Sequence, residues 1–414
     1  MVNDLKIRAS LGTLGNADIG NYPIYSTLEA RTYALNEIKV GGYTLSTAVN
    51  TDVKWETTKK YNFGMDASLF KSKIYFTADY FISNTTNLLF MKPIPESSGK
   101  NQWALPYINA GEIQNKGFEF ELGIREVKGD FSYDISTNFS TSRNKVIDLA
   151  GLDQMIGYYN PPIINTITEV GNPINSYFGY KTNGIIQTQA NLDAYKAMLY
   201  ATDPADITAG LGDVWRLDLN GYDDNGKLTG KPDGKIDAAD RTVIGKRYPA
   251  FTYGLVSNVS YKRFSLQVQL QGVSGYDLPI NGQNLYYFQG NPENSNAVIL
   301  NRWDASSNPN GTLPRLTRSD PAGNLAEFSD IWLSDASYLR INNMNLSYDL
   351  PESICKKLYS SGLKVYCSVQ NLYTFTKFMG VEPDITLGDS FWGGIAADKM
   401  PQPRTWIFGL KVSF

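Results

Sequence analysis

The sequence predicts an all-β fold, an antiparallel transmembrane β-barrel of the outer-membrane type, and three observations support this prediction. Apolar and polar residues alternate with a period of two from one end of the chain to the other. Very short turns and long joins follow each other between the alternating segments. Aromatic residues make up 13% of the 414 residues and charged residues only 19%, yet the mean hydropathy is −0.30. Membrane β-strands combine these properties because lipid-facing and water-facing residues alternate along each strand.

Most of the expected strands come in pairs that are adjacent in the sequence. A strand at 5–11 is followed by pairs at 61–69 with 74–82, 118–125 with 131–139, and 251–261 with 264–270. Further strands are expected at 338–350, 363–374 and 404–414, with a weaker one at 176–187, which gives about eleven in all. The second face of the strand at 264–270 is uniformly polar, which the core of a β-sandwich would not need.

The connections between these strands differ sharply in length. The short turns lie at 70–73, 128–130 and 262–263. The long joins lie at 84–116, 143–175, 188–248, 273–335 and 376–403. Short turns on one rim and long loops on the other are typical of outer-membrane barrels, where the turns are periplasmic and the loops extracellular. The third join contains a short expected helix, because Leu192, Tyr195 and Leu199 have helical spacing after Asn191.

Composition excludes several classes of function. The sequence contains no histidine, which removes Ser/His/Asp and Cys/His catalysis and imidazole metal sites, so we do not expect an enzyme. Glu119 and Glu121 stand two apart on one strand face, and we interpret them as part of a solvated lumen wall. The net charge of −3, without a long basic run, argues against nucleic acid as a partner. Cys355 and Cys367 cannot form a zinc site, and free thiols are favoured over a disulfide.

The last strand ends in an aromatic residue after an unbroken alternation. Every second residue is apolar, and the opposite face is mostly small or polar. This pattern resembles the C-terminal signal that the bacterial barrel-assembly machinery recognises, although an ordinary amphipathic strand could also end in phenylalanine. The residues assigned to this signal are Trp406, Phe408, Leu410, Val412 and Phe414.

Six segments in order along the chain carry a family resemblance. They are 5–16, 54–62, 109–119, 237–245, 338–348 and 369–375. Together they resemble the SusC/RagA-like TonB-dependent transporters of Bacteroidetes outer membranes, and the match extends from the first residues to Phe414. The resemblance implies a barrel of about 22 strands around an N-terminal plug, energised through a TonB box and often capped by a SusD-like lipoprotein.

The sequence departs from that family pattern at its N-terminus. It shows no signal peptide, TonB box or plug, and its expected strands make about half of a 22-stranded barrel. We therefore expect residues 1–414 to be the C-terminal part of a single β-barrel domain. The partners that follow are outer-membrane lipid, a SusD-like surface lipoprotein, the missing N-terminal half, and TonB only through that missing half.

The resemblance implies nutrient uptake across the outer membrane, with an oligosaccharide or a peptide as the substrate. Two alternatives stay open. A passive porin would need the first and last strands of a smaller barrel to pair with each other. An adhesin or surface scaffold would need loops without a transport path.

Two groups of loop residues are candidate binding sites. An acidic stretch resembles a calcium loop with about eleven inserted residues, since oxygen donors at alternating positions suit a hard cation; an Asx-rich turn cluster is the alternative. Its candidate ligands are Asp218, Asn220, Asp233, Lys235 through its carbonyl, Asp237 and Asp240, and calcium is the only cofactor that the sequence suggests. Tryptophans in the long loops suit contact with sugars or peptides, but could equally form an interface girdle. These are Trp103, Trp303, Trp332 and Trp392.

Overall fold

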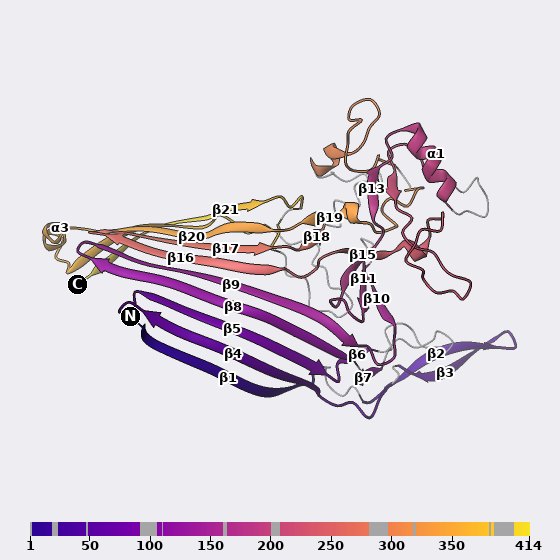
Figure 1. Ribbon diagram of the computed structural model, residues 1–414, viewed down its shortest axis with the longest axis horizontal. Helices are drawn as coiled ribbons and strands as arrows, with labels where there is room; N and C mark the ends of the chain where they lie inside the picture. Colours follow the sequence, from indigo (N-terminus) through magenta and orange to yellow (C-terminus); the bar gives the residue numbers. More distant parts are fainter. Residues whose placement is uncertain are drawn as a thin grey trace.

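The computed structural model forms one long antiparallel sheet with a layer of folded loops at one end (Figure 1). It describes residues 2–18, 24–46, 49–91, 106–109, 111–159, 164–199, 208–280, 297–317, 320–380, 382–384 and 401–414. Both termini lie at the end of the sheet opposite the loop layer (Figure 1). This is the arrangement that the alternation of short turns and long joins predicts.

The main sheet contains ten strands, each paired with its sequence neighbours in the sheet. In order across the sheet they are β1 (Val2–Asn16), β4 (Glu56–Leu69), β5 (Ile74–Thr86), β8 (Glu112–Lys128), β9 (Phe131–Asp148), β16 (Phe251–Tyr261), β17 (Phe264–Ser274), β20 (Tyr338–Asp349), β21 (Gly362–Thr376) and β22 (Thr405–Ser413). Ten of the expected strands are therefore confirmed. Seven of them extend beyond the predicted bounds at the loop side, whereas β16 has the predicted bounds and β20 and β22 are slightly shorter.

The remaining strands belong to small sheets. A four-stranded sheet joins β10 (Gln154–Tyr159), β11 (Ile164–Glu169), β12 (Ser176–Gly179) and β15 (Thr242–Gly245). The two-stranded sheets are β2 (Leu28–Leu35) with β3 (Ile38–Leu45), β6 (Leu89–Met91) with β7 (Tyr107–Asn109), β13 (Thr182–Ile185) with β14 (Val214–Arg216), and β18 (Asp277–Pro279) with β19 (Leu333–Asp335).

The prediction of a barrel strand at 176–187 is wrong. It is divided into β12 and β13, which pair in two different small sheets within the loop layer. Ser176 and Tyr177 point to opposite faces of β12, and both are buried. A barrel strand keeps one face toward lipid and one toward water, so burial on both faces identifies a strand packed among loops.

The described helices are short. Helix α1 (Gln189–Met198) confirms the predicted helix. Thr188 is its N-cap, and the Thr188 hydroxyl accepts a hydrogen bond from the backbone N–H of Asn191. Helix α3 (Glu352–Lys357) lies in the β20–β21 turn, and single 3-10 turns occur at Ala238–Asp240, Ala297–Asn301 and Asp330–Trp332. Among the residues with a described position, no helix is long and apolar enough to cross a membrane.

The hydrophobic cores lie mainly in the loop layer and not on the sheet. One core contains Ile164, Tyr177, Phe328 and Trp332, and a second surrounds α1 through Leu192 and Tyr195. The apolar residues of the long strands are instead exposed, including Ile7 and Phe408, which are 79% and 76% exposed. An exposed apolar stripe that continues over adjacent strands is the lipid-facing coat of a barrel.

Two rows of aromatic side chains bound this coat. At the short-turn end, Phe131, Tyr261, Phe264 and Tyr348 lie directly opposite one another across β9, β16, β17 and β20. At the loop end, the ring of Phe251 lies 5.3 Å from that of Phe139. Ten residues of β16 separate Phe251 from Tyr261, about 33 Å along a strand. At a strand tilt of about 40° this is about 25 Å along the membrane normal, the height of the apolar band between aromatic girdles.

A charged side chain should therefore destabilise the barrel by different amounts on the two faces of β17. Val268 lies on the lipid-facing side near mid-height, whereas its neighbour Gln269 lies on the opposite face. In the intact protein folded into liposomes, we expect Val268→Arg to lower the free energy of unfolding by about 2–4 kcal/mol, the cost of a cation at the bilayer midplane. The matched change Gln269→Arg should cost less than about 1 kcal/mol. Equal losses in urea titrations of the two reconstituted variants would contradict this assignment of faces.

Candidate functional site

A charged cluster joins three neighbouring strands on the polar face of the sheet. The guanidinium of Arg8 on β1 donates to Asp66 on β4 at 2.9 Å and to Asp79 on β5 at 2.8 Å. Gly64 lies opposite both Arg8 and Asp79, and a Cβ there would approach the Asp79 carboxylate to 2.4 Å. The glycine therefore makes room for the contact between Arg8 and Asp79 within the wall.

Aromatic side chains on this polar face lie over glycines of the next strand. Tyr75 covers Gly123, and Phe81 covers Gly117, where a Cβ would come within 1.9 and 2.6 Å of the respective ring. The guanidinium of Arg125 lies 5.7 Å from the Tyr75 ring centre. Aromatic residues over cross-strand glycines restore the packing that glycine lacks. This arrangement also keeps the large rings close to the wall, so the rings fill less of the space in front of the wall.

A patch of neutral amides lies on the polar face of β17 and β20. Gln267 lies opposite Asn345, and Gln269 lies opposite Asn343, which form an amide patch across β17 and β20. Among the described residues, the carbonyl oxygens of the Asn343 and Asn345 side chains are buried and accept no hydrogen bond. These two oxygens are covered by neighbouring atoms, so the amide patch carries no charge but does not expose these acceptors to a solute.

A concavity lies on the polar face beneath the loops, at the loop-side ends of β5, β8, β9 and β16. Its volume is about 410 Å³. Its lining combines hydroxyl and amide groups with apolar side chains, and Tyr248 is the one lining residue with an ionisable side chain. The polar residues are Thr85, Asn115, Ser140, Ser142, Asn144 and Thr252, and the apolar ones are Leu88, Ile113, Ile174, Pro249 and Phe251. We call this concavity the neutral cavity.

Asn144 fixes the roof of the neutral cavity to its wall. Its amide nitrogen donates to the side-chain oxygen of Asn115 at 2.8 Å, and its own oxygen accepts the backbone N–H of Ile174 at 2.9 Å. Ile174 belongs to the loop that folds back over the end of β9, where Val146 and Leu149 are buried. The neutral cavity is therefore formed jointly by the barrel wall and a loop.

A buried carboxylate connects two distant loops above the sheet. Asp213 is 1% exposed, and it accepts hydrogen bonds from Arg315 at 2.7 and 2.9 Å and from Asn324 at 2.9 Å. The hydrogen bonds with Asp213 raise the pKa of the Arg315 guanidinium above its ordinary value. Because Asp213 and Arg315 are 102 residues apart in the chain, this pair fixes the loop after α1 to the loop before β19.

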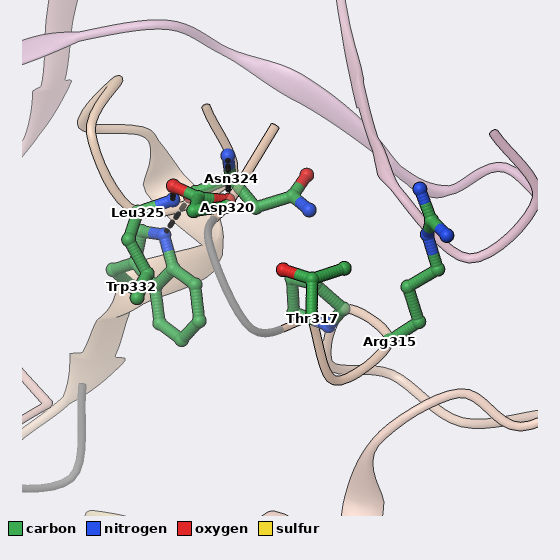
Figure 2. A pocket seen from close by; sticks show the side chains of 7 residues that line it. Arg315, Thr317, Asp320, Asn324, Leu325 and Trp332 are labelled. Carbon is green, nitrogen blue, oxygen red and sulfur yellow. Dashed lines mark hydrogen bonds between the residues drawn. The ribbon is translucent and has the colours of Figure 1, made fainter. Parts of the chain in front are cut away.

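Figure 2 shows the small pocket beside this pair. Asp320 accepts the backbone N–H groups of Asn324 and Leu325, and the Trp332 indole donates to the Asn324 carbonyl at 2.8 Å. The pocket has a volume of about 10 Å³, room for at most one water molecule. It is part of the packing of the loop layer and is too small for a nutrient.

Comparison with known proteins decides the family. Residues 2–372 match the family model described as TonB dependent receptor-like, beta-barrel. The chain belongs to the TonB-dependent receptor β-barrel family.

Similar proteins specify the branch of this TonB-dependent family. TonB-dependent receptor P3 of Formosa agariphila is 29% identical over 99% of this chain and 39% of its own length. TonB-dependent receptor SusC of Bacteroides thetaiotaomicron is 27% identical over 100% of this chain and 38% of its own length. The solved structure of the RagAB peptide importer in the 'closed-closed' state has a TM-score of 0.74 and 26% identity, and covers 100% of this chain and 41% of that chain.

These similarities confirm the SusC/RagA resemblance and the barrel fold. The chain spans about two fifths of the length of the relatives it matches. The ten-stranded sheet is accordingly a partial barrel of the TonB-dependent type.

In this TonB-dependent barrel, the predicted tryptophans occupy different positions. Trp332 is 1% exposed and packs in a loop core, so its position gives no support to ligand contact. Trp303 is half-buried, and its ring packs against Gly212. Trp103 and Trp392 lie outside the described residues. A direct role for any of the four in ligand binding stays a prediction.

The acidic stretch forms a compact turn cluster in which carboxylates bind backbone N–H groups. Asp240 accepts from Leu219, Asn220 and Asp237, and Asp218 accepts from Asp233 and Gly234. Asn220 accepts from Gly230, Asp233 accepts from Lys235, and Asp237 accepts from Ala239. Within the described part of the chain, no group of three or more His, Cys, Asp or Glu side chains is placed to hold a metal ion. The arrangement matches the Asx-turn alternative, and calcium binding stays a prediction.

The C-terminal strand lies at one edge of the sheet. β22 pairs with β21, and Trp406, Phe408, Leu410, Val412 and Phe414 are all exposed. Their side chains alternate with the opposite face as predicted. Recognition of this strand by the assembly machinery stays a prediction.

The neutral cavity was not predicted from the sequence. Its residues from β8 and β9 continue the polar alternation of predicted strands beyond the membrane band, which is a usable signal. The contribution of Ile174 and Tyr248 depends on how the loops fold back, and no local pattern indicates it.

Loss of the buried carboxylate should loosen the loop layer without opening the sheet. We expect Asp213→Ala to destabilise the loops by about 3–5 kcal/mol, because Arg315 is left without its partner. Hydrogen exchange should rise in 208–217 and 313–325 and stay unchanged in β16 and β17. The exposed Asp224→Ala serves as the control; similar exchange in the two variants would disprove the connecting role.

Calcium binding has a direct calorimetric test. A calcium site in the acidic stretch predicts heat on titration of the wild-type protein that is lost in Asp233→Ala. Asp224→Ala, in the inserted residues, is the matched control. Equal heats from the wild type and Asp233→Ala exclude the site.

Proposed function

We propose that this chain forms part of the wall and extracellular loops of a TonB-dependent outer-membrane transporter that takes up oligosaccharides or peptides together with a SusD-like lipoprotein. Family members are outer-membrane proteins, and the relatives are TonB-dependent receptors and a peptide importer. The observation that carries the proposal is the neutral cavity on the lumen face beneath the loops.

The chemistry of the neutral cavity suits a neutral polar solute. Hydroxyl and amide groups exchange hydrogen bonds with sugar hydroxyls or peptide groups, and Tyr248 adds an aromatic surface. A volume of about 410 Å³ matches a few sugar rings or residues and falls within the usual range of ligand pockets. We propose binding and transport without bond chemistry, consistent with a sequence that has no histidine.

The edges of the sheet support a larger barrel. Among the described residues, β1 and β22 each pair with one strand of the main sheet and not with each other. A small self-closed porin would pair these two strands. Unpaired strand edges cannot remain in hydrocarbon, so additional strands must complete the barrel.

The β2–β3 hairpin supports a protein partner. It projects beyond the loop end of β1 and β4 (Figure 1), and Tyr33, Ile38 and Tyr43 on it are 68%, 66% and 77% exposed. An isolated two-stranded hairpin is marginally stable in water. Contact with the proposed lipoprotein would cover these side chains.

The cavity can be tested by uptake in a strain that lacks the chromosomal gene. Ser142 lines the neutral cavity, whereas Ser257 lies on the lipid-facing side of β16. We expect Ser142→Val to reduce growth or uptake on the transported oligosaccharide or peptide about 5- to 10-fold at limiting concentration, the loss of roughly one hydrogen bond. Ser257→Val should leave uptake unchanged, and an equal effect of both substitutions would reject the cavity as the binding site.

Energy coupling separates the proposal from a porin or a scaffold. Uptake by the intact protein should stop when the proton-motive force is collapsed or TonB is deleted. Uptake that persists would indicate a passive porin, and surface display without uptake on any of the oligosaccharides and peptides tested would indicate a scaffold.

A further inference from the structure

The short-turn rim of the sheet has a positive net charge, whereas the rest of the chain has a negative net charge. The turn segments 70–73, 126–130, 261–264 and 351–361 contain seven Lys or Arg side chains and three Asp or Glu side chains. The whole chain has a net charge of −3, so this positive rim stands against a more acidic remainder. The seven cations are all exposed: Lys71, Lys73, Lys128, Lys262, Arg263, Lys356 and Lys357.

Each of these turns also exposes an apolar side chain next to a cation. Phe70 precedes Lys71, Val127 precedes Lys128, and Tyr261 precedes Lys262. The Nζ of Lys262 lies 5.4 Å from the Tyr261 ring centre. Tyr261 belongs to the aromatic row at the short-turn end, so its pair with Lys262 lies where the apolar band ends. Val127 lies on the polar face of β8 and lines a concavity there with Lys71 and Lys73.

Helix α3 makes the largest of these exposed elements. It follows Tyr348 of the girdle by four residues and lies at the same end of the sheet as the termini (Figure 1). Cys355 is buried against the turn, whereas Ile354, Leu358 and Tyr359 are 41%, 56% and 93% exposed. Lys356 and Lys357 are exposed beside them.

We propose that this positive rim, with α3 as its main element, is an interfacial anchor that binds anionic phospholipid headgroups of the periplasmic leaflet. The rim continues the lipid-facing coat, since Ser361 bonds to the carbonyl of Ser413 and places the turn beside the exposed Phe414. Lysine side chains next to apolar groups at this level place their stems in the acyl boundary and their ammonium groups among phosphates.

Photocrosslinking tests the depth of α3 in the intact protein, expressed with everything its gene encodes. A benzoyl-phenylalanine that replaces Tyr359 should form phospholipid adducts on irradiation of outer-membrane vesicles. The same probe in place of Phe408 should also react with lipid. In place of Tyr222, which lies in an exposed loop, the probe should not react with lipid. Lipid adducts at position 408 but protein adducts, or none, at position 359 would overturn the anchor while leaving the barrel placement intact. No lipid adducts at either position would reject both.

Lipid selectivity tests the charge. In detergent with equal amounts of phosphatidylglycerol and phosphatidylcholine, native mass spectrometry should show preferential retention of phosphatidylglycerol. Lys356→Gln with Lys357→Gln should lower that preference about fivefold per lysine, the factor for roughly 1 kcal/mol each. The matched double variant, Lys227→Gln with Lys231→Gln, changes two lysines that are exposed in a long loop. It should leave the preference for phosphatidylglycerol unchanged. An unchanged preference in the rim variant would overturn the proposal.

Discussion

The backbone hydrogen-bond ladder of ten antiparallel strands is the constraint on which the rest of this structure depends. In a bilayer, each backbone N–H and C=O must find its partner within the protein, because hydrocarbon offers none. The ladder meets this demand from β4 to β21 and leaves one open edge at β1 and another at β22. Both the polar face and the lipid-facing coat follow from the alternation of side chains along that ladder.

The same constraint moves the hydrophobic core out of the sheet. Since one face of each long strand contacts lipid and the other contacts water, neither can bury a conventional core, and the buried clusters form in the loops. Loop cores need connections between distant segments. The hydrogen bonds of Asp213 with Arg315 and Asn324 supply them, and Asn144 connects one loop to the wall that it covers.

How far the sequence predicts the structure depends on the distance between interacting residues. The pairs 61–69 with 74–82 and 251–261 with 264–270 could be predicted because period-two alternation and a short turn are local signals. The segment 176–187 was assigned wrongly because its alternation also fits a strand buried on both faces. The burial of Trp332, the contact of Asp213 with Arg315 and the roof of the neutral cavity depend on long-range folding of loops. No spacing in the sequence indicates them.

The distribution of charge on the polar face explains how one wall can both stabilise the barrel and let a solute pass. On β1, β4 and β5 the Arg8 guanidinium pairs with both Asp66 and Asp79, and Tyr75 and Phe81 lie close over glycines. On β17 and β20 the face carries the neutral amides of Gln267, Gln269, Asn343 and Asn345. A neutral amide holds a polar solute by one or two hydrogen bonds worth about 1 kcal/mol each, and water readily replaces them. A buried charge without a partner would hold a solute or a counterion far more strongly, so the pairing of Asp79, the more buried of these two carboxylates, with Arg8 favours passage over retention.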